Sequence, residues 1–186
     1  MTPEEITKTL KELFGATVQT PSPGLWQVEA PNMRLLVLLS DDQSWMRVLV
    51  PIAASRDAQP FIEQLLEANF DGTQEARYAL HQDVLWGVFH HSLGSLIAED
   101  FAGAIARLVS LHQTGLSASF NQLVENRMLQ IIQAAKQQGQ SLEATLQTLD
   151  RFYEEGMMGD MTQGLQGKEA VLGAWRSQLE RLWPEV

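Results

Sequence analysis

The chain contains no cysteine among its 186 residues. Disulfide bonds, thiolate catalysis and cysteine-ligated zinc are therefore excluded. Basic residues are also few, since 13 Lys and Arg stand against 23 Asp and Glu and give a formal net charge of −10. Because phosphate contacts require clustered Lys and Arg, we expect neither nucleic acid nor an anionic membrane surface as a partner.

Long apolar runs are missing as well. The longest uninterrupted one, Leu35 to Leu39, is far shorter than the ~20 residues needed to cross a bilayer. The opening residues, Met1 to Glu5, are acidic and lack the basic start and apolar stretch of a signal peptide. We therefore expect a cytoplasmic protein. Hydrophobic residues still make up 45% of the chain, which argues against disorder and allows a sizeable core.

The first segments predict a capped helix followed by strands. Thr2 and Glu5 have the spacing of a capping box, Pro3 takes the first helical position, and Gly15 can end the helix. Pro21 to Gly24 is predicted to be a loop. Three apolar runs are then typical of strands: Leu25 to Ala30, Met33 to Ser40 and Trp45 to Ile52.

A second helix and a hairpin come next. Pro60 is predicted to open a helix that ends at Asp71-Gly72 and carries an apolar stripe. The stripe consists of Phe61, Ile62, Leu65, Leu66 and Phe70. Two strands, Arg77 to His81 and Val84 to His91, flank a tight Gln82-Asp83 turn. From about Ile97 the apolar period becomes helical, with Gly115 as a break.

The remaining residues predict further helices. One continues to Gly139, a second is capped by Ser141, and a third runs around Lys168 to Trp183. Met157 to Gly167 is rich in Gly and Met and is predicted to be a linker, with an adaptable contact through its methionines as the alternative. The fold class is thus α+β: a helix-strand-strand-strand-helix-strand-strand-helix antiparallel sheet domain over residues 1–116 and a C-terminal helical extension over 117–186.

The strand patterns place apolar residues on both faces of the sheet. A two-residue turn at Asp41-Asp42 pairs Leu38 with Trp45 and Leu36 with Arg47, whereas a turn longer by one residue reverses the faces. In the first register one face carries Met33, Leu35, Val37, Met46, Val48, Val50 and Ile52, and the other carries Arg34, Leu36, Leu38, Trp45, Arg47 and Leu49. The first and third helices can cover one face. A second copy of the chain, the C-terminal helices or an extended client is left to cover the other.

The element order over residues 2 to about 114 resembles the type III secretion chaperone-like fold family, which includes bacterial regulator-type proteins. The segment Tyr78 to Val88 carries the most specific likeness, because it looks like that family's strand, acidic turn and strand before the final helix. The resemblance implies an acidic, cytosolic homodimer that holds an extended segment of a client protein without catalysis. Residues from about Ser117 onward depart from a minimal chaperone of this type.

No motif predicts an enzyme, a metal or a cofactor. His90 and His91 are adjacent on a strand and point to opposite faces, and His81 lies roughly 20 Å from His90 along the hairpin. The expected function is a non-enzymatic, chaperone-like module that binds a client polypeptide. A regulatory domain that senses a small ligand between the sheet and the tail helices is the alternative, and a cryptic enzyme ranks last. The candidate partner-binding residues are Trp26, Leu36, Leu38, Trp45, Leu49 and Trp86, and burial in the core is the competing interpretation of each tryptophan.

Overall fold

A computed structural model describes residues 1–155 and 168–185. The predicted linker at Met157 to Gly167 lies outside these residues. The chain divides into two compact units, Met1–Ser119 and Phe120–Val186. This division falls after Ser119, whereas the sequence predicted a boundary after Leu116.

The first helix, α1 (Pro3–Phe14), has the predicted capping box. The Thr2 hydroxyl accepts a hydrogen bond from the Glu5 amide, and the Glu5 carboxylate accepts one from the Thr2 amide at 2.8 Å. Gly15 ends the helix with φ +61°, a backbone conformation that favours glycine. The local sequence therefore specifies both ends of α1, as predicted.

Six antiparallel strands form one sheet in the order β1-β2-β3-β4-β6-β5. They are β1 (Val18–Ser22), β2 (Leu25–Ala30), β3 (Met33–Leu39), β4 (Trp45–Ala54), β5 (Arg77–His81) and β6 (Val84–Ser92). The α+β class and the antiparallel sheet are confirmed, but β1 was missed. Pro21 suggested a loop, yet an edge strand tolerates proline, and the β1–β2 register is irregular between Gln19 and Ser22.

The predicted register of β3 against β4 is wrong by two residues. Leu36 lies opposite Leu49 and Leu38 opposite Arg47, because the connection has four residues rather than two. A shift of two residues keeps each side chain on its own face, so the predicted face assignment is confirmed.

The β3–β4 turn is closed by one carboxylate. Asp42 Oδ1 accepts hydrogen bonds from the Ser40 hydroxyl at 2.6 Å, the Ser44 amide at 3.0 Å and the Ser44 hydroxyl at 2.8 Å. These bonds, the one from Ser40 first, lower the pKa of Asp42 from 3.8 to about 2.

The β5–β6 hairpin has the predicted tight turn. His81 lies opposite Val84, and Gln82 and Asp83 have φ of 47° and 62°, as a type I′ turn requires. The helix before it differs from the prediction. It begins at Ser55 rather than Pro60 and forms α2 (Ser55–Ala58), a 3₁₀ turn (Gln59–Phe61) and α3 (Ile62–Ala68). Phe70 lies beyond α3 and is 93% exposed, so it does not belong to a buried stripe.

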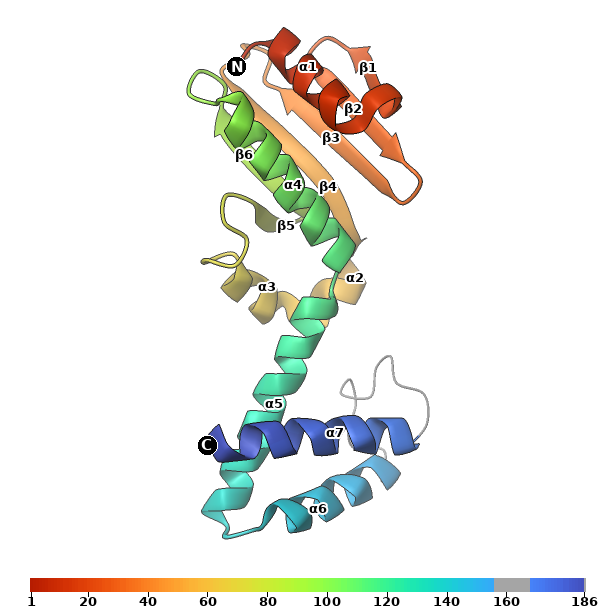
Figure 1. Ribbon diagram of the computed structural model, residues 1–186, viewed down its shortest axis with the longest axis vertical. Coiled ribbons are helices and arrows are strands. Elements are labelled where there is room, and N and C mark those ends of the chain that lie inside the picture. The colour runs from red at the N-terminus through yellow and green to blue at the C-terminus, as the bar shows by residue number, and fades with distance from the viewer. Residues whose placement is uncertain (156–167, 186) are drawn as a thin grey trace. The chain divides into compact units, whose positions relative to one another are not determined.

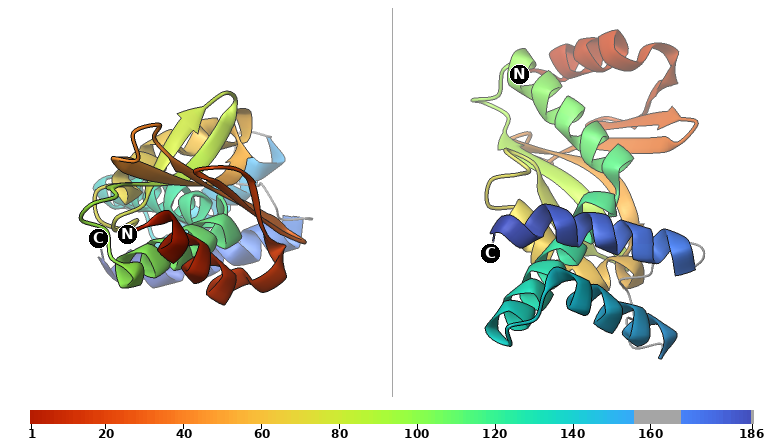
Figure 2. Two further views of the ribbon diagram at one scale, coloured as in Figure 1. Left: turned by 90° about the horizontal axis from the view of Figure 1, so that it is seen from above. Right: turned by 60° about the horizontal axis from the view of Figure 1, so that its bottom comes forward.

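Helices α1 and α4 (Ala98–Thr114) lie on one side of the sheet, which we call the covered face (Figures 1 and 2). Ile6 and Leu10 of α1 and Phe101 and Leu108 of α4 are fully buried in a core with the strands. Gly87 on β6 permits this approach, because a Cβ there would lie 3.2 Å from Leu108 Cδ2. The predicted cover by the first and third main helices is confirmed.

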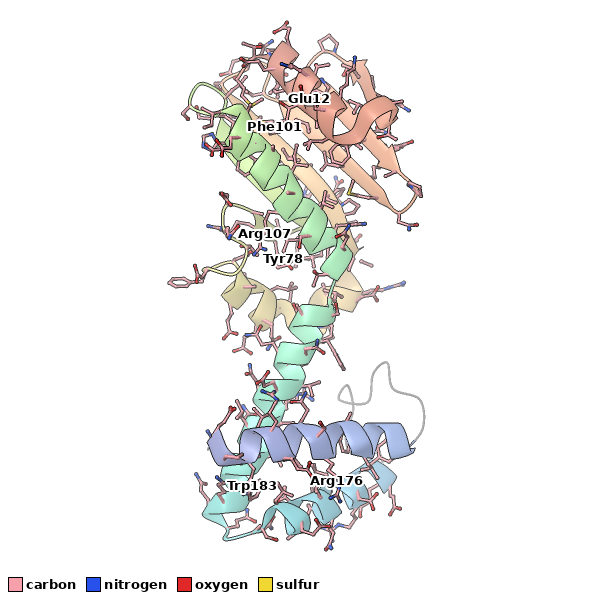
Figure 3. The ribbon with its side chains drawn as sticks, in the orientation of Figure 1. Glu12, Tyr78, Phe101, Arg107, Arg176 and Trp183 are labelled. Atoms are coloured by element: carbon pink, nitrogen blue, oxygen red, sulfur yellow. The ribbon has the colours of Figure 1, made fainter. Side chains whose placement is uncertain are left out.

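The second unit is helical and has its own core. Helices α5 (Ser117–Gln137), α6 (Leu142–Glu154) and α7 (Lys168–Leu182) supply it. Its buried apolar residues are Met128, Ile132, Leu146, Leu149, Trp175, Leu179 and Leu182. Ser141 caps α6 as predicted, by accepting from the Ala144 amide, and Arg176 of α7 pairs with Glu143 of α6 at 3.7 Å (Figure 3). The last helix ends at Leu182, and a 3₁₀ turn (Trp183–Glu185) follows.

Candidate functional site

The side of the sheet turned away from α1 and α4 carries a patch of apolar side chains, which we call the open face. Its large apolar members are Leu25, Leu36, Leu38, Trp45, Leu49, Trp86 and Val88. All seven are half-buried, whereas their neighbours in the strands, such as Val48, are fully buried on the covered face. Each of these side chains thus keeps apolar surface in contact with solvent.

Strand pairing aligns the open-face residues in rows. One row runs across four strands from Leu25 through Leu38 and Arg47 to His90. The next row, two residues further along each strand, runs from Gln27 through Leu36 and Leu49 to Val88. Leucines from β2, β3 and β4 therefore meet at the centre of the sheet, with Arg47 of β4 and His90 of β6 beside them.

Trp45 forms an aromatic and cationic group at one end of this face. Its ring centroid lies 4.6 Å from that of His90, and the Arg47 guanidinium lies 5.1 Å from the Trp45 centroid. Among the described residues, Arg47 has no carboxylate within ion-pair distance. The indole thus holds a guanidinium that lacks an anionic partner.

Trp86 lies toward the opposite end of the open face. It stands opposite Pro51 of β4 and Ala79 of β5, and its Nε1 donates to the His81 carbonyl at 3.1 Å. Trp45 stands opposite Ser92, six residues along β6, so the two tryptophans are ~20 Å apart along the sheet. They bound the patch rather than forming one cluster.

Trp26 does not belong to this surface. It points to the covered face, is 2% exposed, and its Nε1 donates to the Thr7 hydroxyl of α1 at 2.8 Å. Its assignment to the partner-binding residues is therefore corrected, because the β2–β3 register places it opposite Val37, in the core. The other five candidates, Leu36, Leu38, Trp45, Leu49 and Trp86, share the open face.

Sequence reasoning left four residues of the patch out of the candidate site: Leu25, Arg47, Val88 and His90. The alternation of the strands placed Arg47 with Leu36, and the same period of two puts Val88 and His90 on the side of Trp86. What was missing was the pairing of β4 with β6, which joins the two groups across 40 residues of chain.

The free edge beyond the open face is partly closed. Asn69, which follows α3, accepts from the Tyr78 amide at 2.7 Å and donates to the Tyr78 carbonyl at 3.2 Å. Both outward backbone groups of this β5 residue are thus satisfied, which protects an edge strand from pairing with another chain. Burial raises the pKa of the Tyr78 phenol, and the nearby Arg107 opposes that shift (Figure 3).

The histidines have structural contacts. His112 of α4 directs Nδ1 to the Pro51 carbonyl at 2.6 Å and Nε2 to the Asn32 carbonyl at 2.7 Å. His91 stacks on Phe89 with centroids 5.7 Å apart. Within residues 1–155 and 168–185, no group of three His, Asp or Glu side chains could hold a metal ion.

Each unit contains a cavity among its described residues. One of about 320 Å³ in the helical unit is lined from α5 and α6, with Ile131, Leu149 and Phe152 as apolar walls and Arg127 as a charged one. The other, of about 540 Å³, adjoins Asn32 and His112.

Comparisons with known proteins give limited results. No family model matches the chain, and no curated protein matches its sequence. A similar solved structure is that of the HopA1-SchA chaperone-effector complex, with a TM-score of 0.46 and 10% identity over 58% of this chain and 87% of that chain. Among the described residues, no helix is long and apolar enough to span a membrane.

Proposed function

We propose that this chain is a non-enzymatic, chaperone-like protein-binding module of the cytoplasm that holds a client polypeptide on the open face. The single observation that carries the proposal is the row arrangement of half-buried leucines and tryptophans on the side of the sheet away from α1 and α4. Kinship with the type III secretion chaperone-like family is part of the proposal.

The energetic argument concerns solvent-exposed apolar surface. Covering it contributes roughly 25 cal/mol per Å², and binding surfaces are typically anchored by Trp and Arg surrounded by smaller apolar contacts. The open face has that composition, with Trp45 and Arg47 beside Leu38 and Leu49. It rests on a sheet whose other side is a close-packed core, so little ordering is needed before a client binds.

The proposal is tested by Trp45→Asp in the full chain, with Ile97→Asp as the matched control. Both changes replace a large apolar side chain by a carboxylate, but Ile97 directly precedes α4, the helix on the covered face, and is 55% exposed. We expect Trp45→Asp to abolish recovery of a client identified by mass spectrometry from the source cells, while Ile97→Asp retains it. The thermal midpoint should fall by only a few degrees in either variant.

Two outcomes would contradict the proposal. If Trp45→Asp recovers the same proteins as the wild type, the open face does not bind the client. If it unfolds the protein, Trp45 is a core residue, and Leu38→Ser then repeats the test at the centre of the patch.

We also propose that the chain forms a homodimer without using the open face. Leu66 of α3 and Phe70, two residues beyond that helix, are 63% and 93% exposed, and Leu80 on β5 is 49% exposed. Exposed apolar groups of this kind favour association with another surface. Light scattering should give a dimer mass for the wild type and a monomer for Phe70→Ser. A wild-type monomer at all concentrations would contradict this part of the proposal.

The second candidate function is small-ligand sensing, which the cavity between α5 and α6 favours. Its volume of about 320 Å³ and its apolar walls with Arg127 fit a small anionic metabolite with an apolar body. A ligand that binds the native state raises its stability by mass action. A thermal-shift screen should then find saturable stabilisation that Arg127→Gln removes, and no shift across a broad metabolite set would exclude this function.

A further inference from the structure

The charges of the open face identify the chemistry of its occupant. Among the strand residues that share this face, the basic ones are Arg34, Arg47 and Arg77, and the acidic one is Glu29. The whole chain has the opposite balance, with a net charge of −10. The open face is therefore a cationic region on an acidic protein.

Two of the three arginines are already engaged. Arg34 pairs with Glu29 at 3.8 Å and donates to Gln27 at 3.0 Å. Arg77 bends away from the face and donates to the Thr73 hydroxyl and to backbone carbonyls of the same loop. Arg47 differs from both, because its guanidinium lies against the Trp45 ring and has no hydrogen bond or ion pair among the described residues.

His90 adds a second polar group at the same place. It lies directly opposite Arg47 across the β4–β6 pair, and its ring packs on Trp45. Arg47 and His90 are thus cross-strand neighbours that both contact Trp45, and Leu38 and Leu49 lie beside them on the open face. A carboxylate bound there would supply the anionic partner that Arg47 lacks among the described residues.

We propose that the occupant of the open face is an extended, acidic polypeptide segment in which an Asp or Glu stands two positions from an apolar residue, so that both side chains face the sheet. This inference rests on the proposed function and specifies the client. The centre of β3 lies about 7 Å from the midpoint between β4 and β6, at ~4.8 Å per strand. Two residues of an extended chain span that distance at ~3.3 Å each. An apolar side chain over Leu36 and Leu38 thus places an acidic one, two positions on, at Arg47 and His90.

A second copy of this chain fits the face less well. Face-to-face contact between two copies would enclose both Arg47 side chains, and the acid that the face could offer, Glu29, already pairs with Arg34. Enclosing a guanidinium without a carboxylate is unfavourable. A client with its own acidic residues removes this penalty.

The test uses three fluorescein-labelled octapeptides and the full chain. The first peptide is Leu-Ser-Glu-Ser-Leu-Ser-Glu-Ser, in which leucine and glutamate are two positions apart and share one face when the chain is extended. Glutamine replaces glutamate in the second peptide, and lysine replaces it in the third. Fluorescence anisotropy in low salt should show the glutamate peptide binding about three- to tenfold more tightly than the glutamine peptide, the size expected of one or two exposed charge pairs. Salt at 1 M should remove the difference. The net charge of −10 attracts the lysine peptide non-specifically, so a preference for glutamate identifies a local site.

Arg47→Gln and Arg56→Gln provide the matched pair of variants. Arg56 lies on α2, its side chain is 87% exposed, and its ion pair is with the adjacent Asp57. Both substitutions change the net charge equally, but only Arg47→Gln should erase the preference for glutamate. Circular dichroism melts should show both variants folded.

The remaining outcomes show whether the inference fails alone or together with the proposed function. If the glutamine peptide binds as tightly as the glutamate peptide and Leu36→Ser weakens both, the face binds clients and the acidic preference is wrong. If the lysine peptide binds most tightly in high salt, the preference is reversed and the inference is overturned. If no peptide binds, the proposed function and the inference both fail.

Discussion

The two faces of the sheet are built by the same strands but have different surroundings. On β4 the side chains of Met46, Val48 and Val50 are fully buried beneath helices, while Trp45 and Leu49, which alternate with them, are half-buried. Strand propensity cannot separate the faces, since alternate residues of one strand supply both. The difference comes from the helices that pack on one side. The open face, whose large apolar side chains stay half-buried, is therefore the surface on which we propose that a client binds.

The comparison is tested most strongly by truncating two adjacent leucines of β3. Leu35 is fully buried on the covered face, and Leu36 is half-buried on the open face. We expect Leu35→Ala to lower the free energy of unfolding by about 2–5 kcal/mol, because it leaves a cavity in a packed core. Leu36→Ala should cost about 1 kcal/mol or less. Urea denaturation measures both, and equal losses would show that the open face is a second core.

A smaller contrast separates two tryptophans. Trp26→Phe removes the hydrogen bond that Nε1 donates to Thr7 inside the covered face, and should cost about 1–2 kcal/mol of stability. The ring nitrogen of Trp45 donates no hydrogen bond among the described residues, so Trp45→Phe should change stability by about 0.5 kcal/mol or less. Thermal melts compare the two. A larger loss for Trp45→Phe would reverse the assignment of the faces.

The smallest expected effect lies in the turn that leads into Trp45. The hydrogen bonds that Asp42 accepts hold its pKa at about 2, below the ordinary 3.8. A depressed carboxyl pKa contributes stability that is present above pH 3.8 and is lost as the pH falls toward about 2. Asp42→Asn should remove that part of the pH dependence, and Asp41→Asn, which changes the neighbouring carboxylate, should keep it. Thermal melts at pH 5, 3 and 2 measure this pH dependence. If the melting temperatures of the wild type and of Asp42→Asn fall in parallel as the pH is lowered, the Asp42 carboxylate does not stabilise the turn.

Several local features were readable in the sequence because a few neighbouring residues specify them. Thr2 and Glu5 cap α1, Ser141 caps α6, and Gln82-Asp83 closes the second hairpin. The β1 strand was not predicted, because Pro21 suggested a loop. Its strand conformation depends on pairing with β2, which the local sequence does not show. The break of the second helix into α2 and α3 was also missed, because Pro60 suggested a helix start while Ser55 begins the first turn.

The candidate site was only partly predictable for a related reason. Alternation along each strand assigned Leu36, Leu38 and Trp45 correctly to one face, because side chains have a period of two whatever the partner strand. The register between strands depends on the length of the connection, and the four-residue turn at Asp42 shifted it by two positions.

Local patterns in the sequence therefore established the amphipathic strands and the helix caps of this protein, and composition established its acidic balance. The fold decided which apolar residues remain accessible. Pairing β4 with β6 brings Arg47 to His90, and the packing of α1 on the sheet buries Trp26 while leaving Trp45 half-buried. The physical reason is that the burial of a side chain depends on what lies against it, and contacts between residues far apart in the chain are made only when the sheet and its helices assemble.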